Sequence, residues 1–492
     1  MEDDKIYFDL QRVPLASERN EKRQRRRKTF LIFLLCLILF VLGGLLGYFI
    51  YGRLHRTYEV DTIDVLGEIE YDMDNYWLYS SDYDNLIEVL EDKAYYGMTS
   101  FDYDPYTQYM SEQEMLEFST SINMDYVGIG VEYSNADGSA IVKRVFKNSP
   151  AEKAGILPGD IIVAVDGVSI QGFDHDQIRE KVLGEKGTKV TISLERTGTS
   201  IDVDCIRDSI YNTAHTYEDD GYLILELSSF GNTTADEIST YLDEYTDRDE
   251  LIIDLRDDTG GYQNSVKEVC GLFVGNDKVY LKQKDSKGKE TVDYTRANKA
   301  YDNFKKIVII INENTASAAE VFALCLKEIH PNTTIVGTTS FGKGVIQTNR
   351  ALSNGGILKL TAYYWYSPSG KSIHEVGIKP DVEVMMPQIA YEHYYELYDD
   401  ESYGLDTVSE ACRISQLSLE LLGYDISRTD GYFDSNFENA LIQFKKDNNI
   451  DGSAILDSDT YSSIISSAVR ELATNLSKDT QLNKAKEVLD NN

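Results

Sequence analysis

A run of 23 residues without a charged side chain, from Thr29 to Tyr51, constrains this chain more than any other feature. An apolar run of that length is long enough to cross a lipid bilayer as a helix. Seven lysines and arginines precede it between residues 19 and 28, opposed there only by Glu21. By the positive-inside rule, the basic tail of residues 1–28 stays in the cytoplasm and everything after Tyr51 is translocated. We therefore expect a single-pass membrane protein whose folded part lies outside the cytoplasm.

A cleaved signal peptide is the alternative interpretation of the same segment. The apolar run is longer than a typical signal-peptide core and has no clear small-residue cleavage site, although Gly43, Gly44 and Gly47 lie within it. We therefore favour an uncleaved transmembrane helix over residues 29–51.

Length, charge and cysteine usage limit the remaining classes. A chain of 492 residues is too long for one hydrophobic core, so several domains are expected. The net charge of −35 comes from the translocated part, because the first 28 residues are basic, and it argues against nucleic-acid binding. The five cysteines have no paired spacing and the six histidines are scattered. Neither a disulfide framework nor a metal or cofactor site is expected.

Ser317 and Lys343 are the most informative polar pair. Residues 306–311 form a short apolar, β-branched run typical of a buried strand, and residues 317–327 have helical spacing. Ser317 is therefore expected at a strand-to-helix elbow, where free backbone N–H groups and the helix dipole stabilise an oxyanion. Lys343 lies between two glycines at the start of another strand. We interpret the pair as the nucleophile and base of a Ser–Lys hydrolase.

Two simpler interpretations compete with this one. A serine at a helix start is usually an N-cap with no catalytic role. The segment from Gly337 to Lys343 also imitates the phosphate-binding P-loop, which requires Ser or Thr after the lysine and a helix behind it. Gly344 follows instead, and then a strand-like segment, so the sequence argues against a P-loop.

Further motifs occur in a fixed order between about residues 60 and 385. They are Tyr96-Gly-Met98, Asp104-Pro-Tyr-Thr107, Ile253-Asp-Leu-Arg256 with Gly260-Gly261, Leu358-Lys-Leu-Thr-Ala362, Ser367-Pro-Ser-Gly-Lys-Ser-Ile373 and Gly377-Ile-Lys-Pro-Asp381. Their order resembles that of the carboxyl-terminal processing peptidases, also called tail-specific proteases. The resemblance implies that Ser317 is the nucleophile, that Lys343 is the general base and that Gln347 orients the lysine.

The oxyanion hole is assigned to backbone groups. Gly260 and Gly261 form a loop without Cβ atoms, which a substrate carbonyl can approach closely. We assign the hole to the N–H groups of Gly261 and Ala318, and which of the two glycines donates is left open.

Residues 126–207 resemble a PDZ domain. The candidate loop for binding the carboxylate of a protein C-terminus is Gly128, Ile129, Gly130 and Val131. Successive N–H groups in a glycine loop can capture a terminal carboxylate, while the peptide adds as a strand to the sheet edge. A PDZ fold that serves only as a spacer is the alternative.

The remaining segments are assigned by composition and resemblance. Residues 52–125 are expected to form a helical pre-segment, which in the family helps dimer formation and so implies a homodimer. Residues 208–390 are expected to be the protease domain, of mixed α/β fold because apolar strands alternate with helical segments. Residues 400–472 resemble a small three-helix peptidoglycan-binding domain.

Together these features predict a multidomain α/β protein. It would be a membrane-anchored serine endopeptidase outside the cytoplasmic membrane of a bacterium, selecting protein substrates by their C-terminal ends and tethered to peptidoglycan. A non-catalytic, wall-bound PDZ adaptor is the alternative, and the presence of Ser317, Lys343 and Gln347 argues against it.

Overall fold

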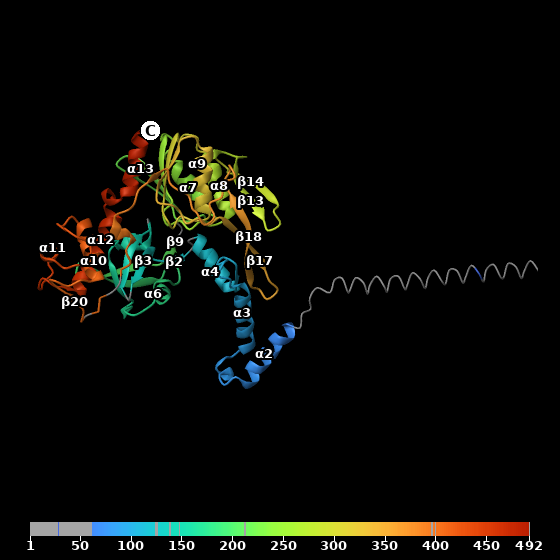
Figure 1. Cartoon of the computed structure of the whole chain (residues 1–492), viewed down its shortest axis with the longest axis horizontal. Helices are drawn as coiled ribbons and strands as arrows, with labels where there is room; N and C mark the ends of the chain where they lie inside the picture. Colours follow the sequence, from blue (N-terminus) through green and yellow to red (C-terminus); the bar gives the residue numbers. More distant parts are fainter. Residues whose placement is uncertain are drawn as a thin grey trace, which may run out of the picture. The chain divides into compact units, whose positions relative to one another are not determined.

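The computed structural model describes Lys28 and residues 62–491, except 124–125, 137–138, 147, 211–212, 395–396 and 399 (Figure 1). The expected membrane-spanning segment, residues 29–51, lies outside these residues. Among the helices that are described, none has both the length and the apolar character needed to cross a bilayer. The chain divides into two compact units, Met1–Met98 and Thr99–Asn492.

Helices make up the described part of the first unit. They are α2 (Thr62–Tyr76), the 3-10 helix η1 (Ser80–Asp82) and α3 (Leu86–Thr99). Leu86 is buried, whereas Tyr76 and Leu78 are exposed. The helical character expected for the pre-segment is therefore present between residues 62 and 99.

The end of the predicted pre-segment belongs to the second unit. It forms β1 (Gln108–Met110) and α4 (Glu112–Asn123). β1 pairs antiparallel with β18 (Ile357–Tyr366), so that Tyr109 lies opposite Leu358. The segment expected as one helical piece is thus divided, because its last part contributes a strand to the protease.

The protease core is built on a six-stranded sheet with the order β10-β11-β12-β15-β16-β19. These strands are β10 (Ala214–Asp219), β11 (Tyr222–Leu227), β12 (Glu250–Asp254), β15 (Lys306–Ile311), β16 (Thr333–Gly337) and β19 (Val382–Glu383). From β11 to β19 all neighbours are parallel, as the alternation of strands and helices predicted. One face carries the helices α7 (Thr234–Leu242), α8 (Gln263–Val274) and α9 (Ala318–Ile329).

The opposite face of the sheet packs against α13 (Thr480–Asn491), near the end of the chain. Ile252 and Val308 lie in one cluster with Leu482 and Leu489. Burial on both faces explains why β15 is apolar at successive positions, as in other parallel strands.

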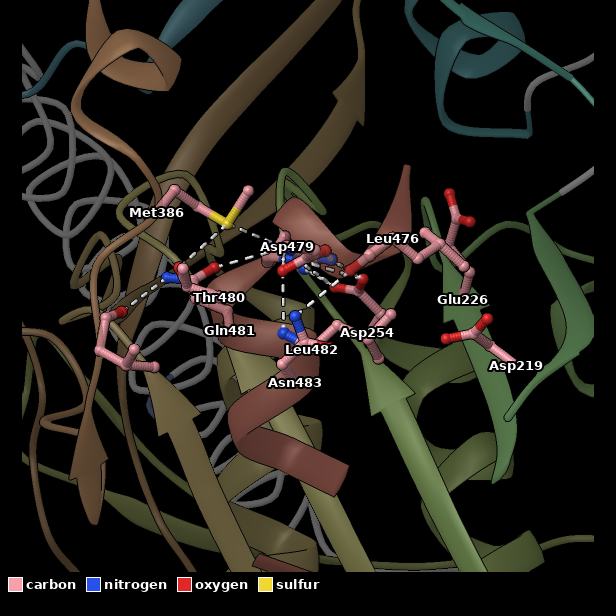
Figure 2. Close-up of polar contacts among 12 residues, drawn as sticks. Asp219, Glu226, Asp254, Met386, Leu476, Asp479, Thr480, Gln481, Leu482 and Asn483 are labelled. Atoms are coloured by element: carbon pink, nitrogen blue, oxygen red, sulfur yellow. Dashed lines mark hydrogen bonds and ion pairs between the residues drawn. The ribbon is translucent and has the colours of Figure 1, made fainter. Parts of the chain in front are cut away.

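Polar contacts hold the start of α13 to the end of the sheet (Figure 2). Arg256 donates to Asp254 at 2.6 Å and to Asp479 at 2.8 Å. Asp479 in turn accepts from the Leu482 N–H at 2.8 Å, and Gln481 donates to the Val384 carbonyl at 2.9 Å. The arginine of the Asp-Leu-Arg motif therefore ties α13 to β12.

A second sheet of the protease has the order β1-β18-β13-β14, with β17 also paired to β18. Its further strands are β13 (Val279–Asp285), β14 (Glu290–Tyr294) and β17 (Val345–Ala351). In the β17–β18 pair, Gln347 lies opposite Thr361 and Asn349 lies opposite Lys359.

The PDZ region has a sheet ordered β3-β4-β5-β7-β8, with β6 paired to β5. Its elements are β2 (Tyr126–Gly128), β3 (Val131–Ala136), β4 (Ser139–Val145), α5 (Pro150–Ala154), β5 (Ile161–Val165), β6 (Val168–Ser169), α6 (His175–Val182), β7 (Lys189–Arg196), β8 (Thr199–Ile206) and β9 (Asp208–Ile210). β2 pairs with β9, and the core includes Ile129, Ile162 and Leu194.

The C-terminal module contains the three helices that were expected. They are α10 (Glu410–Leu421), α11 (Ser435–Asp447) and α12 (Ser458–Thr474), with η2 (Gln388–Tyr391), β20 (Ser402–Tyr403), β21 (Leu456–Asp457) and η3 (Leu476–Lys478) around them. Its core also includes Ile141 and Ile161 of the PDZ sheet. Gly159 lies so close to α12 that a Cβ there would be 2.4 Å from the Ser466 carbonyl. The module and the PDZ region therefore share packed surface.

Candidate active site

Ser317 lies at a sharp turn between β15 and α9. Its φ of 55° and ψ of −116° are a conformation that residues with a Cβ rarely adopt, at a cost of about 1–3 kcal/mol. The Thr315 hydroxyl donates to the Leu255 carbonyl at 2.8 Å, and the Ala316 N–H donates to the Asp258 carbonyl at 2.9 Å. These bonds hold the strained residue at the N-terminus of α9. The predicted strand-to-helix elbow is therefore present.

A buried carboxylate, Glu320, links this turn to the loop that carries Lys343. It accepts from the Ser317 N–H at 2.9 Å and from the Ser340 hydroxyl at 2.5 Å. It also accepts from the N–H groups of Gly342 and Lys343, at 2.7 and 2.9 Å. Burial raises the pKa of Glu320, although these hydrogen bonds act in the opposite direction. Glu320 was not predicted from the sequence, although Ser-x-x-Glu at a helix start is a capping-box pattern.

Lys343 lies in the loop between β16 and β17. The Trp365 indole N–H donates to its carbonyl at 2.7 Å, and the neighbouring Phe341 N–H donates to the Thr315 carbonyl at 3.0 Å. The Nζ atom lies 4.5 Å from the centroid of the Tyr106 ring. The ring therefore holds the ammonium by a cation–π contact. Tyr106 belongs to the Asp-Pro-Tyr-Thr motif, whose role the sequence did not indicate.

The environment of Lys343 favours its neutral form. Burial, and after it the positive charge of Lys359, lower the pKa of Lys343 to about 8, while Glu320 acts to raise it. A lysine base near neutral pH requires a lowering of this kind, because only the neutral amine accepts a proton.

A cavity of about 160 Å³ lies beside Ser317. It is lined by Phe118, Ile122, Gly261, Tyr262, Gln263, Val266, Leu281, Ser317, Ala318, Val321, Val345, Ile346, Gln347, Asn349, Lys359 and Trp365. The fold thus brings Ser317, Ala318, Gly261 and Gln347 around one space. Apolar residues dominate this lining, as is usual for sites that bind a ligand.

The backbone at Gly260 and Gly261 has the geometry expected of a donor loop. Phe230 and Gly261 form a parallel bridge, in which the Phe230 N–H donates to the Gly260 carbonyl and the Tyr262 N–H donates to the Phe230 carbonyl. The Gly261 N–H therefore points away from Phe230. A Cβ at Gly260 would lie 2.8 Å from the Ala318 nitrogen, so this loop directly adjoins the start of α9. A side chain at Gly260 would close that approach, and a Cβ at Gly261 would lie 2.3 Å from the Phe230 carbonyl oxygen.

Gln347 lies at an irregularity of β17, between Ile346 and Gln347. Its side-chain nitrogen is buried and has no hydrogen-bond partner in the described part of the chain. Nor does any hydrogen bond between described residues join Gln347 to Lys343, whose ammonium faces Tyr106 instead. Ser317 and Gln347 therefore line one cavity, whereas Lys343 is not among its lining residues and is joined to the Ser317 turn through Glu320. The contact between lysine and glutamine that the family resemblance implied is not formed among the described residues.

The candidate carboxylate loop lies between β2 and β3 of the PDZ region. Ile129 is buried, and Gly130 has a φ of 80°, with a hypothetical Cβ 2.4 Å from that of Ser149. The Ile129 carbonyl accepts from the Ala151 N–H at 2.8 Å. This loop is therefore held in one conformation by α5.

Across residues 62–491 as described, no cluster of three His, Cys, Asp or Glu side chains is suited to a metal.

These features define a serine peptidase, and comparison with known proteins agrees. The model of peptidase family S41 matches residues 221–384, a PDZ domain model matches residues 141–196, and a peptidoglycan-binding domain model matches residues 409–464. All three ranges lie within the boundaries predicted from the sequence.

Relatives match over most of the chain. The carboxy-terminal processing protease CtpA of Bacillus subtilis is 32% identical over 405 residues, which is 81% of this chain and 85% of that protein. CtpB of the same organism is 32% identical over 398 residues, or 78% and 82% of the two chains. Among solved structures, the photosystem II D1 C-terminal processing protease is 23% identical, covers 66% of this chain and 93% of its own, and has a TM-score of 0.41.

The chain therefore belongs to the C-terminal processing serine peptidases of family S41, with a PDZ domain and a C-terminal peptidoglycan-binding domain. The predicted family and enzyme class are confirmed.

Proposed function

We propose that this peptidase is anchored in the membrane of a bacterial cell, binds the C-terminal ends of proteins through its PDZ domain and cleaves them at Ser317. One observation carries the proposal: the strained turn at Ser317 is joined to the loop of Lys343 through the buried side chain of Glu320. The pKa of Lys343 is lowered, as a lysine base requires. A serine that only caps a helix requires neither a strained backbone nor a connection to a second loop.

The cleavage step follows from these groups. Ser317 Oγ attacks the substrate carbonyl while neutral Lys343 takes the hydroxyl proton, and the N–H groups of Gly261 and Ala318 hold the resulting oxyanion. The lysine then protonates the leaving amine, and the acyl-enzyme is hydrolysed by water with Lys343 again acting as the base. For this the Lys343 side chain must leave the Tyr106 ring, and the side-chain oxygen of Gln347 can accept a hydrogen bond from the ammonium that forms.

Binding and location are proposed from the accompanying domains. A PDZ domain supports recognition of free C-termini, and Gly128, Ile129, Gly130 and Val131 form the loop that would take the carboxylate. The C-terminal module supports attachment to peptidoglycan. The uncharged segment of residues 29–51 supports a single membrane anchor with the N-terminus in the cytoplasm, and the helical pre-segment supports a homodimer.

The test is hydrolysis of an unfolded protein such as casein by the full-length chain, with Ser317→Ala and Lys343→Ala alongside. Both variants should lose hydrolysis by several orders of magnitude while unfolding at the temperature of the wild type. Turnover retained by Ser317→Ala would refute the assignment of the nucleophile. Turnover retained by Lys343→Ala alone would reopen the search for the base. His374, whose backbone adjoins Gly344, would be the first residue to test in its place.

A further inference from the structure

The cavity contains a charged side chain that the cleavage chemistry does not use. Lys359 on β18 is the only Asp, Glu, Lys or Arg among the described residues that line the space beside Ser317. Lys359 lies opposite Asn349 of β17. Two residues further along the two strands, Gln347 lies opposite Thr361. In an antiparallel pair, the side chains of two opposite residues point to the same face of the sheet. The side chains two positions further along each strand point to that face as well. Lys359 is therefore on the same face as Gln347.

The Lys359 ammonium has an aromatic neighbour instead of an anion. Its Nζ lies 4.4 Å from the centroid of the Phe118 ring on α4, and no carboxylate among the described residues forms an ion pair with it. Partial burial lowers the pKa of Lys359. An ammonium that has lost part of its hydration without gaining a counter-ion is stabilised when a carboxylate binds beside it.

We propose that Lys359 binds a carboxylate of the peptide being cleaved, so that an acidic group near the scissile bond determines which substrates are processed. The carboxylate belongs either to an Asp or Glu side chain or to the free C-terminus of a short substrate tail. This inference rests on the proposed cleavage at Ser317.

The cavity that Lys359 shares with Ser317 supports this role. Ser317 and Lys359 both line this space of about 160 Å³, so a peptide residue that fills it lies against both side chains. The chain has a net charge of −35, which repels acidic peptides at long range. Lys359 supplies at the site itself the attraction that the surface lacks.

The experiment uses the full-length enzyme and quenched fluorescent peptides that share one cleavable sequence. In one series a single Glu is moved through the three positions on each side of the scissile bond, and each peptide is paired with its Gln counterpart. In a second series the distance from the scissile bond to the C-terminus is varied, with that end either free or amidated. The ratio of kcat/KM within each pair is measured.

For one position of the carboxylate, the wild-type kcat/KM should be about tenfold higher for the acidic peptide than for its neutral counterpart. This ratio is expected for one charge-assisted hydrogen bond. A preference confined to Glu over Gln identifies a side-chain carboxylate, and one confined to free over amidated short tails identifies a terminal carboxylate. Lys359→Met should reduce the ratio to about one, and Lys359→Arg should keep it. Lys359→Glu should invert the ratio, and should cleave a further peptide with Lys at that position faster than the Gln peptide. The inverted preference cannot arise from misfolding.

Lys379→Met is the matched control, because Lys379 is an exposed lysine of the same domain outside the cavity lining. It should keep the wild-type ratio. Equal rates for every acidic and neutral pair in the wild type, or an unchanged ratio in Lys359→Met, would overturn the role of Lys359 while leaving cleavage at Ser317 intact. Hydrolysis of all peptides by Ser317→Ala would instead refute the cleavage site itself.

Discussion

At the scale of single residues, the site depends on opposing charges around Lys343. Burial and the positive charge of Lys359 favour the neutral amine, whereas Glu320 favours the ammonium. The Tyr106 ring also favours the ammonium, because a cation binds its face and a neutral amine does not. The balance of these groups decides at which pH Lys343 can serve as a base.

The first prediction concerns the pH dependence of cleavage. Since the neutral amine is the active form, kcat/KM should rise with pH through one ionisation with a midpoint near pH 8. Lys359→Met should move the midpoint upward, because the Lys343 ammonium is then no longer repelled by the positive charge of Lys359. Lys343→Arg should be inactive throughout, since guanidinium does not deprotonate in this range. A flat profile between pH 6 and 10 would exclude lysine as the base.

The second prediction concerns Glu320 as a positioning residue. Glu320→Gln removes the negative charge that raises the pKa of Lys343, so the midpoint should move downward, opposite to Lys359→Met. The amide also cannot accept all four hydrogen bonds that the carboxylate accepts. We therefore expect kcat to fall by about 10- to 100-fold and the free energy of unfolding to fall by about 1–3 kcal/mol. Stopped assays across pH together with urea unfolding measure both. An N-cap role alone would change stability and leave the midpoint in place.

At the scale of secondary-structure elements, the protease sheet is completed from the end of the chain. α9 and its neighbours cover one face, and α13 covers the other through Leu482, Ala485 and Leu489. The charge-assisted bonds of Arg256 to Asp479 fix the start of this helix. Because β15 leads directly to the Ser317 turn, the packing of α13 on β15 supports the strand that positions the nucleophile.

The third prediction tests this support. Leu482→Ala removes a fully buried side chain between α13 and the sheet, and should lower the free energy of unfolding by about 2–5 kcal/mol. Glu487→Ala, on the exposed side of the same helix, is the control and should change it by less than about 0.5 kcal/mol. Urea unfolding followed by circular dichroism measures the difference. Equal stability of the two variants would mean that α13 does not belong to the protease core.

At the scale of the whole molecule, the second unit joins the PDZ region to the C-terminal module. Ile141 and Ile161 lie in the core of the module, and Arg470 on α12 approaches Asp160 to 3.6 Å. A PDZ fragment cut from the chain would expose these isoleucines to water. Binding of peptides is therefore best measured on the full-length chain.

The fourth prediction concerns that binding. On full-length Ser317→Ala, peptides ending in a free apolar residue should bind with an affinity on the order of micromolar or weaker, and their amidated forms should not bind. Gly130→Ala should abolish binding, because its Cβ would collide with Ser149. Gly167→Ala has similar positive-φ strain but open space around it, and should still bind. Equal binding of free and amidated peptides would leave the PDZ region as a spacer.

The sequence by itself determined the features that depend on neighbouring residues. The β-branched run before Ser317 and the helical spacing after it predicted the elbow, because strand, turn and helix preferences act over a few residues. The two glycines around Lys343 marked its loop for the same reason. The alternation of such segments also predicted the parallel α/β core, since parallel strands require crossover connections.

Contacts between distant segments were decided only by the tertiary structure. No sequence pattern indicated that α13 would cover β15, because an amphipathic helix shows that it needs a partner without showing which one. The placement of Tyr106 against Lys343, and of Lys359 in the cavity of Ser317, likewise depends on how β1 and β17 pair with β18. Strand pairing across many residues is set by the packing of the whole domain, which no local pattern encodes.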